Sequence, residues 1–216
     1  MSRKLYIFVF LIIFSLYSQI SAQHYGTSIK VSTLGVTIDG IRSFGSSLNG
    51  RLGVAFFTLT QDGGGGTDEY IYTADAKLTS VSLLADYFPF GGVFRLTGGF
   101  LINLNKAELE MTPNKSYNIG GDVYTPEKLG KLNADIDFNK FAPYLGIGFG
   151  NPMSGNFGLK FTFDVGTMYQ GAPKIDLSAS GLIEPSAAPD QEATIEDNIN
   201  WFQWYPVINF GLTYKF

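Results

Sequence analysis

The stretch NWFQWYPVINFGLTYKF, from Asn200 to Phe216, decides the fold expected for this chain. Successive side chains of a β-strand point to opposite faces, so every second residue shares a face. One face of this stretch is apolar throughout: Phe202, Trp204, Pro206, Ile208, Phe210, Leu212, Tyr214 and Phe216. The other face is small or polar: Gln203, Tyr205, Val207, Asn209, Gly211, Thr213 and Lys215. A strand of this kind, ending on an aromatic residue, is typical of the last strand of a barrel whose wall separates lipid from a narrow interior.

The composition of the chain supports a lipid-facing barrel over a water-soluble one. Charged residues make up 16% of the 216 residues, against roughly 25% in ordinary soluble domains. The 26 glycines, 12 tyrosines and 19 phenylalanines favour strands, tight turns and aromatic belts. The absence of cysteine excludes disulfides and thiolate metal sites.

The first 22 residues are predicted to be a signal peptide. Arg3 and Lys4 precede an apolar run from Leu5 to Tyr17, and small residues lead to Ala22, after which we expect cleavage. The mature domain is then residues 23–216. Two of the 15 basic residues leave with the peptide, so the mature chain has 13 basic and 19 acidic residues. An acidic chain without a basic cluster makes nucleic acid an unsuitable partner.

Short turns alternate with longer connections along the mature chain. The short ones are Ser46–Asn49, Pro89–Gly92 and Asn151–Gly155, and the long polar ones are Gln61–Glu69, Met111–Asn133 and Gly181–Asn198. A fourth connection, at the same end of the barrel as the long loops, is expected near Leu34–Asp39. Seven connections give eight strands, with short turns and both termini in the periplasm and long loops outside. We therefore predict an all-β, closed, antiparallel up-and-down transmembrane barrel in the outer membrane.

Several segments resemble an uncharacterised family of bacterial outer-membrane barrel proteins. They are Asp86–Phe90 followed by Phe94 and Arg95, Tyr117–Gly121, Pro143–Asn151, and the closing Trp204–Pro206. The architecture is also similar to the small eight-stranded barrels of the OmpA and OmpW type. The resemblance implies a location and a fold, and no activity.

Six charged residues are expected to face the lumen as a salt-bridged layer near its periplasmic end: Lys30, Arg51, Asp86, Arg95, Lys160 and Asp164. A symmetric hairpin around Pro89–Gly92 places Asp86 opposite Arg95. The layer either plugs the barrel, because an eight-stranded interior is just wide enough for side chains, or lines a conducting or ligand-binding lumen. The inward glycines Gly146, Gly148, Gly158 and Gly166 either leave room for a solute or face large residues such as Phe57, Leu101, Tyr144 or Tyr205.

Eight aromatic residues near strand ends are expected to form belts at the membrane interfaces. They are Tyr87, Phe90, Phe149, Tyr169, Trp201, Trp204, Tyr214 and Phe216. The expected partners are outer-membrane lipid and lipopolysaccharide, and the barrel-assembly machinery through the strand that ends at Phe216. A small solute is a further candidate partner.

No catalytic, cofactor or metal site is predicted. The single histidine, His24, lies beside the expected mature N-terminus, where a positioned general base is improbable. Five acidic residues of the last loop, which form either a cation site or, more simply, a solvated surface, are Glu184, Asp190, Glu192, Glu196 and Asp197. In the same loop Ile195, Ile199 and Phe202 follow helical spacing after Pro189, which predicts a short amphipathic helix that packs on the barrel rim or acts as a lid.

Three functions compete on this evidence. The first is an outer-membrane barrel with a structural or surface-interaction role through its external loops. The second is a narrow channel for small or apolar solutes. The third is a secreted, soluble lipocalin-like barrel with the apolar faces turned inward.

Overall fold

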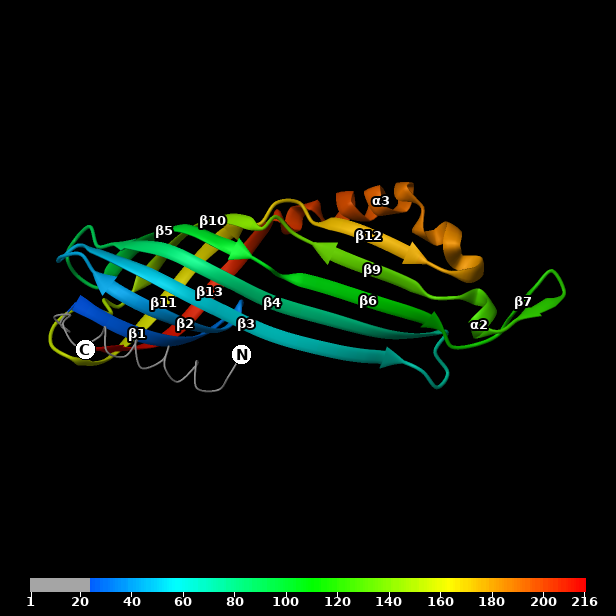
Figure 1. The fold of residues 1–216 in the computed structure, drawn as a ribbon, viewed down its shortest axis with the longest axis horizontal. Helices are drawn as coiled ribbons and strands as arrows, with labels where there is room; N and C mark the ends of the chain where they lie inside the picture. Colours follow the sequence, from blue (N-terminus) through cyan, green and yellow to red (C-terminus); the bar gives the residue numbers. More distant parts are fainter. Residues whose placement is uncertain (1–23) are drawn as a thin grey trace, which may run out of the picture.

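A closed ring of eight antiparallel strands forms the main body of the molecule (Figure 1). The computed structural model describes residues 24–216, so the expected signal peptide lies outside the described residues. The ring is closed by pairing of the first strand with the last, Gly26 lying opposite Lys215. In ring order the strands are β1 (Tyr25–Ser32), β2 (Gly35–Ser43), β3 (Leu48–Gly64), β4 (Tyr70–Tyr87), β5 (Phe94–Asn103), β10 (Phe141–Phe149), β11 (Gly158–Tyr169) and β13 (Trp204–Lys215). The predicted eight-stranded up-and-down barrel is confirmed.

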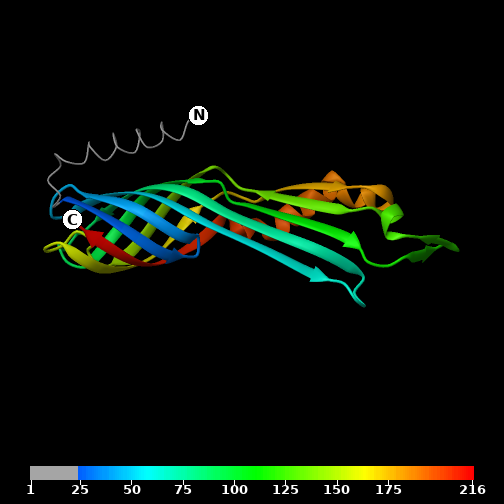
Figure 2. The ribbon, with the colours of Figure 1, turned by 60° about the horizontal axis from the view of Figure 1, so that its bottom comes forward.

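The same sheet extends beyond the barrel wall on one side only (Figures 1 and 2). Strand β4 pairs with β5 through its second half, Ser80 to Tyr87, and with β6 through its first half, Tyr70 to Lys77. Strand β9 then pairs with β6, and β12 with β9. We call this part, which includes the outer half of β3, the external sheet. Its added strands are β6 (Lys106–Pro113), β9 (Leu132–Asp137) and β12 (Lys174–Ala179).

Short helices and one small hairpin complete the part of the molecule beyond the barrel. They are β7 (Tyr117–Ile119), β8 (Asp122–Tyr124), α2 (Pro126–Leu129), η3 (Gly181–Ala187), α3 (Pro189–Ile199) and η4 (Asn200–Gln203). The helix predicted after Pro189 is thus confirmed as α3. Among residues 24–216, none of the helices has the length and apolarity needed to cross a membrane.

Three details of the predicted layout are wrong. Residues 200–203 form the helix η4, so the last strand begins at Trp204 and Phe202 is not part of it. The connection expected at Leu34–Asp39 is the tight turn at Thr33 and Leu34, because β2 already starts at Gly35. The connection Met111–Asn133 is not a plain loop, since it holds β7, β8, α2 and the ends of β6 and β9.

The polarity of the wall inverts where the external sheet leaves the barrel. On the outer face of β4, Val81 and Leu83 are apolar and exposed, whereas Lys77 and Asp75 occupy the same face further along. The inner face of β4 changes in the opposite sense, from Asp86, Ser82 and Ser80 in the barrel to Leu78, Ala76 and Ala74 beyond it. The barrel has an apolar exterior and a polar interior, and the external sheet has the reverse.

Helix α3 shields the free edge of the external sheet. An unpaired edge strand exposes backbone N–H groups that can template pairing with another chain. On β12, the amide of Ile175 donates to Glu196 Oε1 and the amide of Leu177 donates to Glu192 Oε1, both at 2.9 Å. The acidic residues of the last loop are therefore not equivalent. Glu192 and Glu196 cap the edge strand, whereas the other three, Glu184, Asp190 and Asp197, are exposed.

Candidate functional site: the barrel lumen

A closed network of three cations and three carboxylates occupies the lumen. Asp164 lies at its centre, 2.6 Å from Arg95 Nη2, 3.4 Å from Arg51 Nη1 and 3.7 Å from Lys30 Nζ. Asp39 lies 2.6 Å from Lys30 Nζ. Asp86 lies 3.0 Å from Arg51 Nε and 3.7 Å from Arg95 Nε. All six side chains are at most 5% exposed.

Charge balance makes this buried network tolerable. An unpaired charge in a low-dielectric interior costs several kcal/mol, and here each charge lies within 4 Å of at least one of opposite sign. Arg95 also donates from Nη1 to the carbonyl oxygen of Gly150, and Thr97 donates to Asp86 Oδ1 at 2.7 Å. The network therefore ties β1, β2, β3, β4, β5 and β11 together across the lumen.

Glycines on neighbouring strands leave the space that these side chains fill. Gly148 lies opposite Arg95 on one side and opposite Asp164 on the other. A Cβ at Gly148 would lie 2.5 Å from Asp164 Oδ1 and 2.7 Å from Arg95 Nε. Gly146 and Gly166 are similarly close to the hydroxyl of Tyr144. Three of the four inward glycines thus face large side chains, whereas a Cβ at Gly158 would meet nothing within 4 Å.

The structure brings five of the six predicted lumen charges together and excludes the sixth. Lys160 lies four residues before Asp164, about 13 Å away along the strand at ~3.3 Å per residue, and it makes no ion pair with any described residue. The sixth member of the network is instead Asp39, which the prediction left in a loop and which pairs with Lys30. The register is also shifted: Asp86 lies opposite Thr97, so its contact with Arg95 is diagonal.

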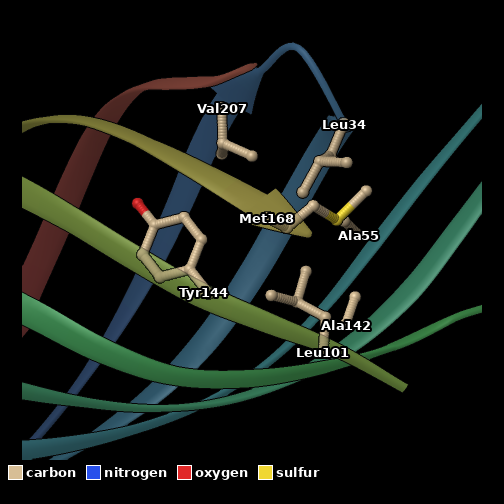
Figure 3. Close-up of a cluster of buried hydrophobic side chains, with 7 residues drawn as sticks. All are labelled: Leu34, Ala55, Leu101, Ala142, Tyr144, Met168 and Val207. Carbon is tan, nitrogen blue, oxygen red and sulfur yellow. The ribbon is translucent and has the colours of Figure 1, made fainter. Parts of the chain in front are cut away.

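A buried apolar cluster lies next to the ion pairs inside the barrel, and Figure 3 draws its side chains. It consists of Leu34, Ala55, Leu101, Ala142, Tyr144, Met168 and Val207, all buried, with Leu84 and Tyr205 packed against it. A pocket of about 30 Å³ lies between the cluster and the ion pairs, enough for one or two water molecules. Phe57 is not part of this packing. It is 44% exposed, because β3 has already left the barrel at that point.

The predicted belt residues are all exposed and form two groups. Tyr87, Phe90, Phe149, Tyr214 and Phe216 lie at the end of the barrel that carries the short turns, and Tyr169, Trp201 and Trp204 lie at the other end. Several touch one another: the rings of Tyr169 and Trp204 are 4.9 Å apart, and those of Tyr214 and Phe216 are 5.4 Å apart. His24 is exposed at the barrel end where β1 begins.

Comparison with solved structures shows that other proteins share this fold. Acinetobacter baumannii CarO2 aligns with a TM-score of 0.61 and 20% identity, over 89% of this chain and 98% of that one. Acinetobacter baumannii CarO aligns with a TM-score of 0.59, the same identity and the same coverage. A major outer membrane protein from Thermus thermophilus aligns at a TM-score of 0.46 and 17% identity, over 89% and 99% of the two chains. No family model and no curated protein matches the sequence. The chain has the fold of an outer-membrane β-barrel.

Proposed function

We propose that the protein is an integral outer-membrane barrel with a closed lumen, and that its external sheet is the surface that interacts with partners. The carrying observation is the double closure of the lumen, by the neutral ion-pair network and by the apolar cluster. This packing favours a plugged barrel over a conducting pore. The external sheet, in contrast, offers a large folded surface beyond the barrel.

The outer wall supports insertion into lipid. Its exposed side chains are large and apolar, among them Leu52, Leu83, Leu145, Phe161 and Phe210. Strand β13 has 12 residues, which at ~3.3 Å per residue and a tilt of ~40° span about 30 Å, enough to cross an apolar band of ~25 Å. A soluble lipocalin-like barrel needs these faces turned inward. Lipid and lipopolysaccharide are then the partners of the wall.

The unequal ends of the barrel support one orientation. Long extensions of outer-membrane barrels face outward and short turns face the periplasm, which favours the external sheet outside and both termini in the periplasm. The cysteine-free sequence allows a direct test with single-cysteine variants and a membrane-impermeant maleimide. We expect Asp122→Cys, at the β7–β8 tip, to be labelled in intact cells and Ser46→Cys, in the β2–β3 turn, only after lysis. The reverse pattern would overturn the proposed orientation.

Electrical recording and liposome swelling separate a closed barrel from a channel. For the purified protein in lipid bilayers we expect no discrete openings and no flux of small solutes. Arg95→Ala removes a central member of the ion-pair network and leaves the apolar cluster in place, so this variant should also stay closed. A stable open current in the unmodified protein, raised by Arg95→Ala, would establish the channel instead.

A further inference from the structure

One charged side chain lies on the otherwise uncharged outer wall of the barrel. Arg42, near the end of β2, is exposed on the outer face of that strand. The other outward side chains of the eight described strands, within the barrel, carry no charge, because their remaining charged residues point into the lumen. A charge on the lipid face of a barrel destabilises it more the deeper it lies. A single arginine in this position is therefore a candidate for a specific contact.

The register places Arg42 at the level of the aromatic belt at the short-turn end. It lies opposite Tyr25 of β1. The amide of Phe216 donates to the carbonyl oxygen of Tyr25 at 3.0 Å, so the three residues form one row across neighbouring strands. Phe216 is one of the exposed belt residues at this end. Aromatic belts lie at the boundary between hydrocarbon and headgroups, which is also the depth of the lipid phosphates.

Two aromatic rings hold the guanidinium of Arg42 in place. Its Cζ lies 5.1 Å from the ring centroid of Phe44 and 5.5 Å from that of Tyr25, within the range of cation–π contacts. Phe44 itself packs on Gly50, where a Cβ would lie 3.0 Å from Cε2 of the ring. Arg42 makes no ion pair with any acidic residue between positions 24 and 216. Its fixed N–H donors can therefore serve an anion from outside the protein.

A groove runs along the outer wall beside Arg42. It has a volume of about 790 Å³, and Gly40 lies in its floor, opposite Thr27 on one side and Leu52 on the other. A Cβ at Gly40 would meet only the carbonyl oxygen of Leu52, 3.9 Å away, so no side chain covers this glycine. Leu52 and Leu83 line the groove on one side and Phe216 on the other. The groove thus combines an apolar channel with one cation.

We propose that this groove binds one phospholipid of the periplasmic leaflet that has a net anionic headgroup. The phosphodiester oxygens accept hydrogen bonds from Arg42, whose planar fork of donors matches phosphate, and one acyl chain lies over Gly40. Lipid surrounds the apolar wall, so an acyl chain is the occupant that the groove meets. An anionic headgroup is favoured over a zwitterionic one because the outer face of the described barrel strands offers no carboxylate to an ammonium group. The inference rests on the proposed membrane insertion and orientation.

The test measures how brominated phospholipids quench a single tryptophan in phosphatidylcholine vesicles. The reporter is introduced by Ile38→Trp in the background Trp201→Phe/Trp204→Phe, which removes both natural tryptophans. Ile38 is exposed on the same face as Arg42, four residues away, which is about 13 Å at ~3.3 Å per residue and suits bromine in the middle of a bound chain. We expect phosphatidylglycerol to bind beside the reporter ~3- to 5-fold more strongly than phosphatidylethanolamine, each at the same mole fraction.

Variants at the cation test the headgroup contact. Arg42→Gln should abolish the preference for phosphatidylglycerol. Arg42→Lys should retain part of it, because lysine keeps the charge and loses the planar fork of donors. In Arg42→Gln/Leu159→Arg the charge is moved to an exposed position on the outer face of β11, and the preference should not return.

Variants at the glycine test the acyl-chain contact. Gly40→Leu fills the groove without meeting a neighbouring side chain, and it should abolish the preference, with quenching normalised to that by brominated phosphatidylcholine in the same variant. Gly98→Leu is the matched control. It also lies on the outer face of a barrel strand, β5, and outside the groove, so the preference should persist.

Three outcomes overturn the site. They are equal binding of the two lipids, a preference that survives Arg42→Gln or Gly40→Leu, and a preference that the relocated arginine restores, which would show general attraction to anionic lipid. Quenching by brominated phosphatidylcholine reports membrane insertion alone, and its absence would instead overturn the proposed function. Mobility on gels before and after boiling shows that each variant is folded.

Discussion

Glycine and charge are matched residue by residue inside the barrel. Lys30 lies opposite Gly211, Asp39 lies opposite Gly53, and Arg95 and Asp164 flank Gly148. In each case a Cβ on the glycine would lie closer than 3 Å to the facing side chain. Four of the six charged side chains in this narrow layer, those of Lys30, Asp39, Arg95 and Asp164, thus gain their space from a glycine on the neighbouring strand.

This matching predicts that Gly148→Ala destabilises the barrel. The new methyl group would displace Asp164 or Arg95 from their contact, and overpacking of this kind costs about 1–3 kcal/mol. Gly98→Ala is the matched control: it lies on the outer face of β5, where a Cβ would be 3.6 Å from Leu145 Cδ2, an ordinary contact. We expect Gly98→Ala to change stability by less than ~0.5 kcal/mol. Urea unfolding of the two variants in lipid vesicles measures the difference.

Asp164 should be the most sensitive of the lumen charges, because it contacts all three cations. Asp164→Asn leaves those cations with two carboxylates, and breaking a buried ion pair costs about 3–5 kcal/mol. Lys160→Gln, on the same strand and outside the network, should cost less than ~1 kcal/mol. The denaturant midpoints of the two variants check this ranking, and equal midpoints would contradict the assignment of Lys160.

At the scale of residues, the sequence predicts the face of the strand on which a side chain lies better than it predicts the side chains that it contacts. Alternation assigned Lys30, Arg51, Asp86, Arg95 and Asp164 to the lumen, and they lie there. Contacts depend on register, which turn geometry sets: the β4–β5 connection shifts the expected pairing of Asp86 by two residues. Asp39 was missed because the β1–β2 turn is only two residues long, too short to stand out as a turn signal.

At the scale of elements, α3 replaces a missing strand. It lies along β12, and its glutamates at i and i+4 reach successive outward-pointing amides of the edge strand, those of Ile175 and Leu177. This role was not apparent from the sequence, which predicted the helix but not β12 or the external sheet. The sheet strands are short and their polarity is inverted relative to the barrel, so a search for apolar outer faces misses them.

Removing both glutamates should open the edge. In the double variant Glu192→Ala/Glu196→Ala, the amides of Ile175 and Leu177 lose their charged acceptors. Each of these hydrogen bonds contributes about 1.5–3 kcal/mol of stability. We expect hydrogen exchange at Ile175 and Leu177 to accelerate, with exchange in β11 and β13 unchanged. Glu184→Ala, on the neighbouring helix η3 and exposed, serves as the control and should leave exchange at both amides unaltered. Protection that persists in the double variant would mean that α3 shields the edge by packing alone.

At the scale of the whole molecule, the inversion of polarity divides the protein into a part solvated by lipid and a part solvated by water. Strands β3 and β4 run through both parts without a break, so the same backbone pleat has its apolar side outward in one and inward in the other. Helix α3 covers the edge strand β12 of the external sheet. On the apolar inner face of the sheet, Phe57 and Leu59 remain exposed.

The two tryptophans lie on either side of this division and can locate it. Trp204 is on the outer face of β13 beside Tyr169, whereas Trp201 is in η4 above the barrel. In single-tryptophan variants, Trp201→Phe and Trp204→Phe, we expect brominated lipids to quench Trp204 strongly and Trp201 weakly, and aqueous acrylamide to do the opposite. Bromine at different acyl positions places Trp204 at the shallow end, as expected for an interfacial belt residue. Strong lipid quenching of Trp201 would move this boundary outward and put η4 inside the membrane.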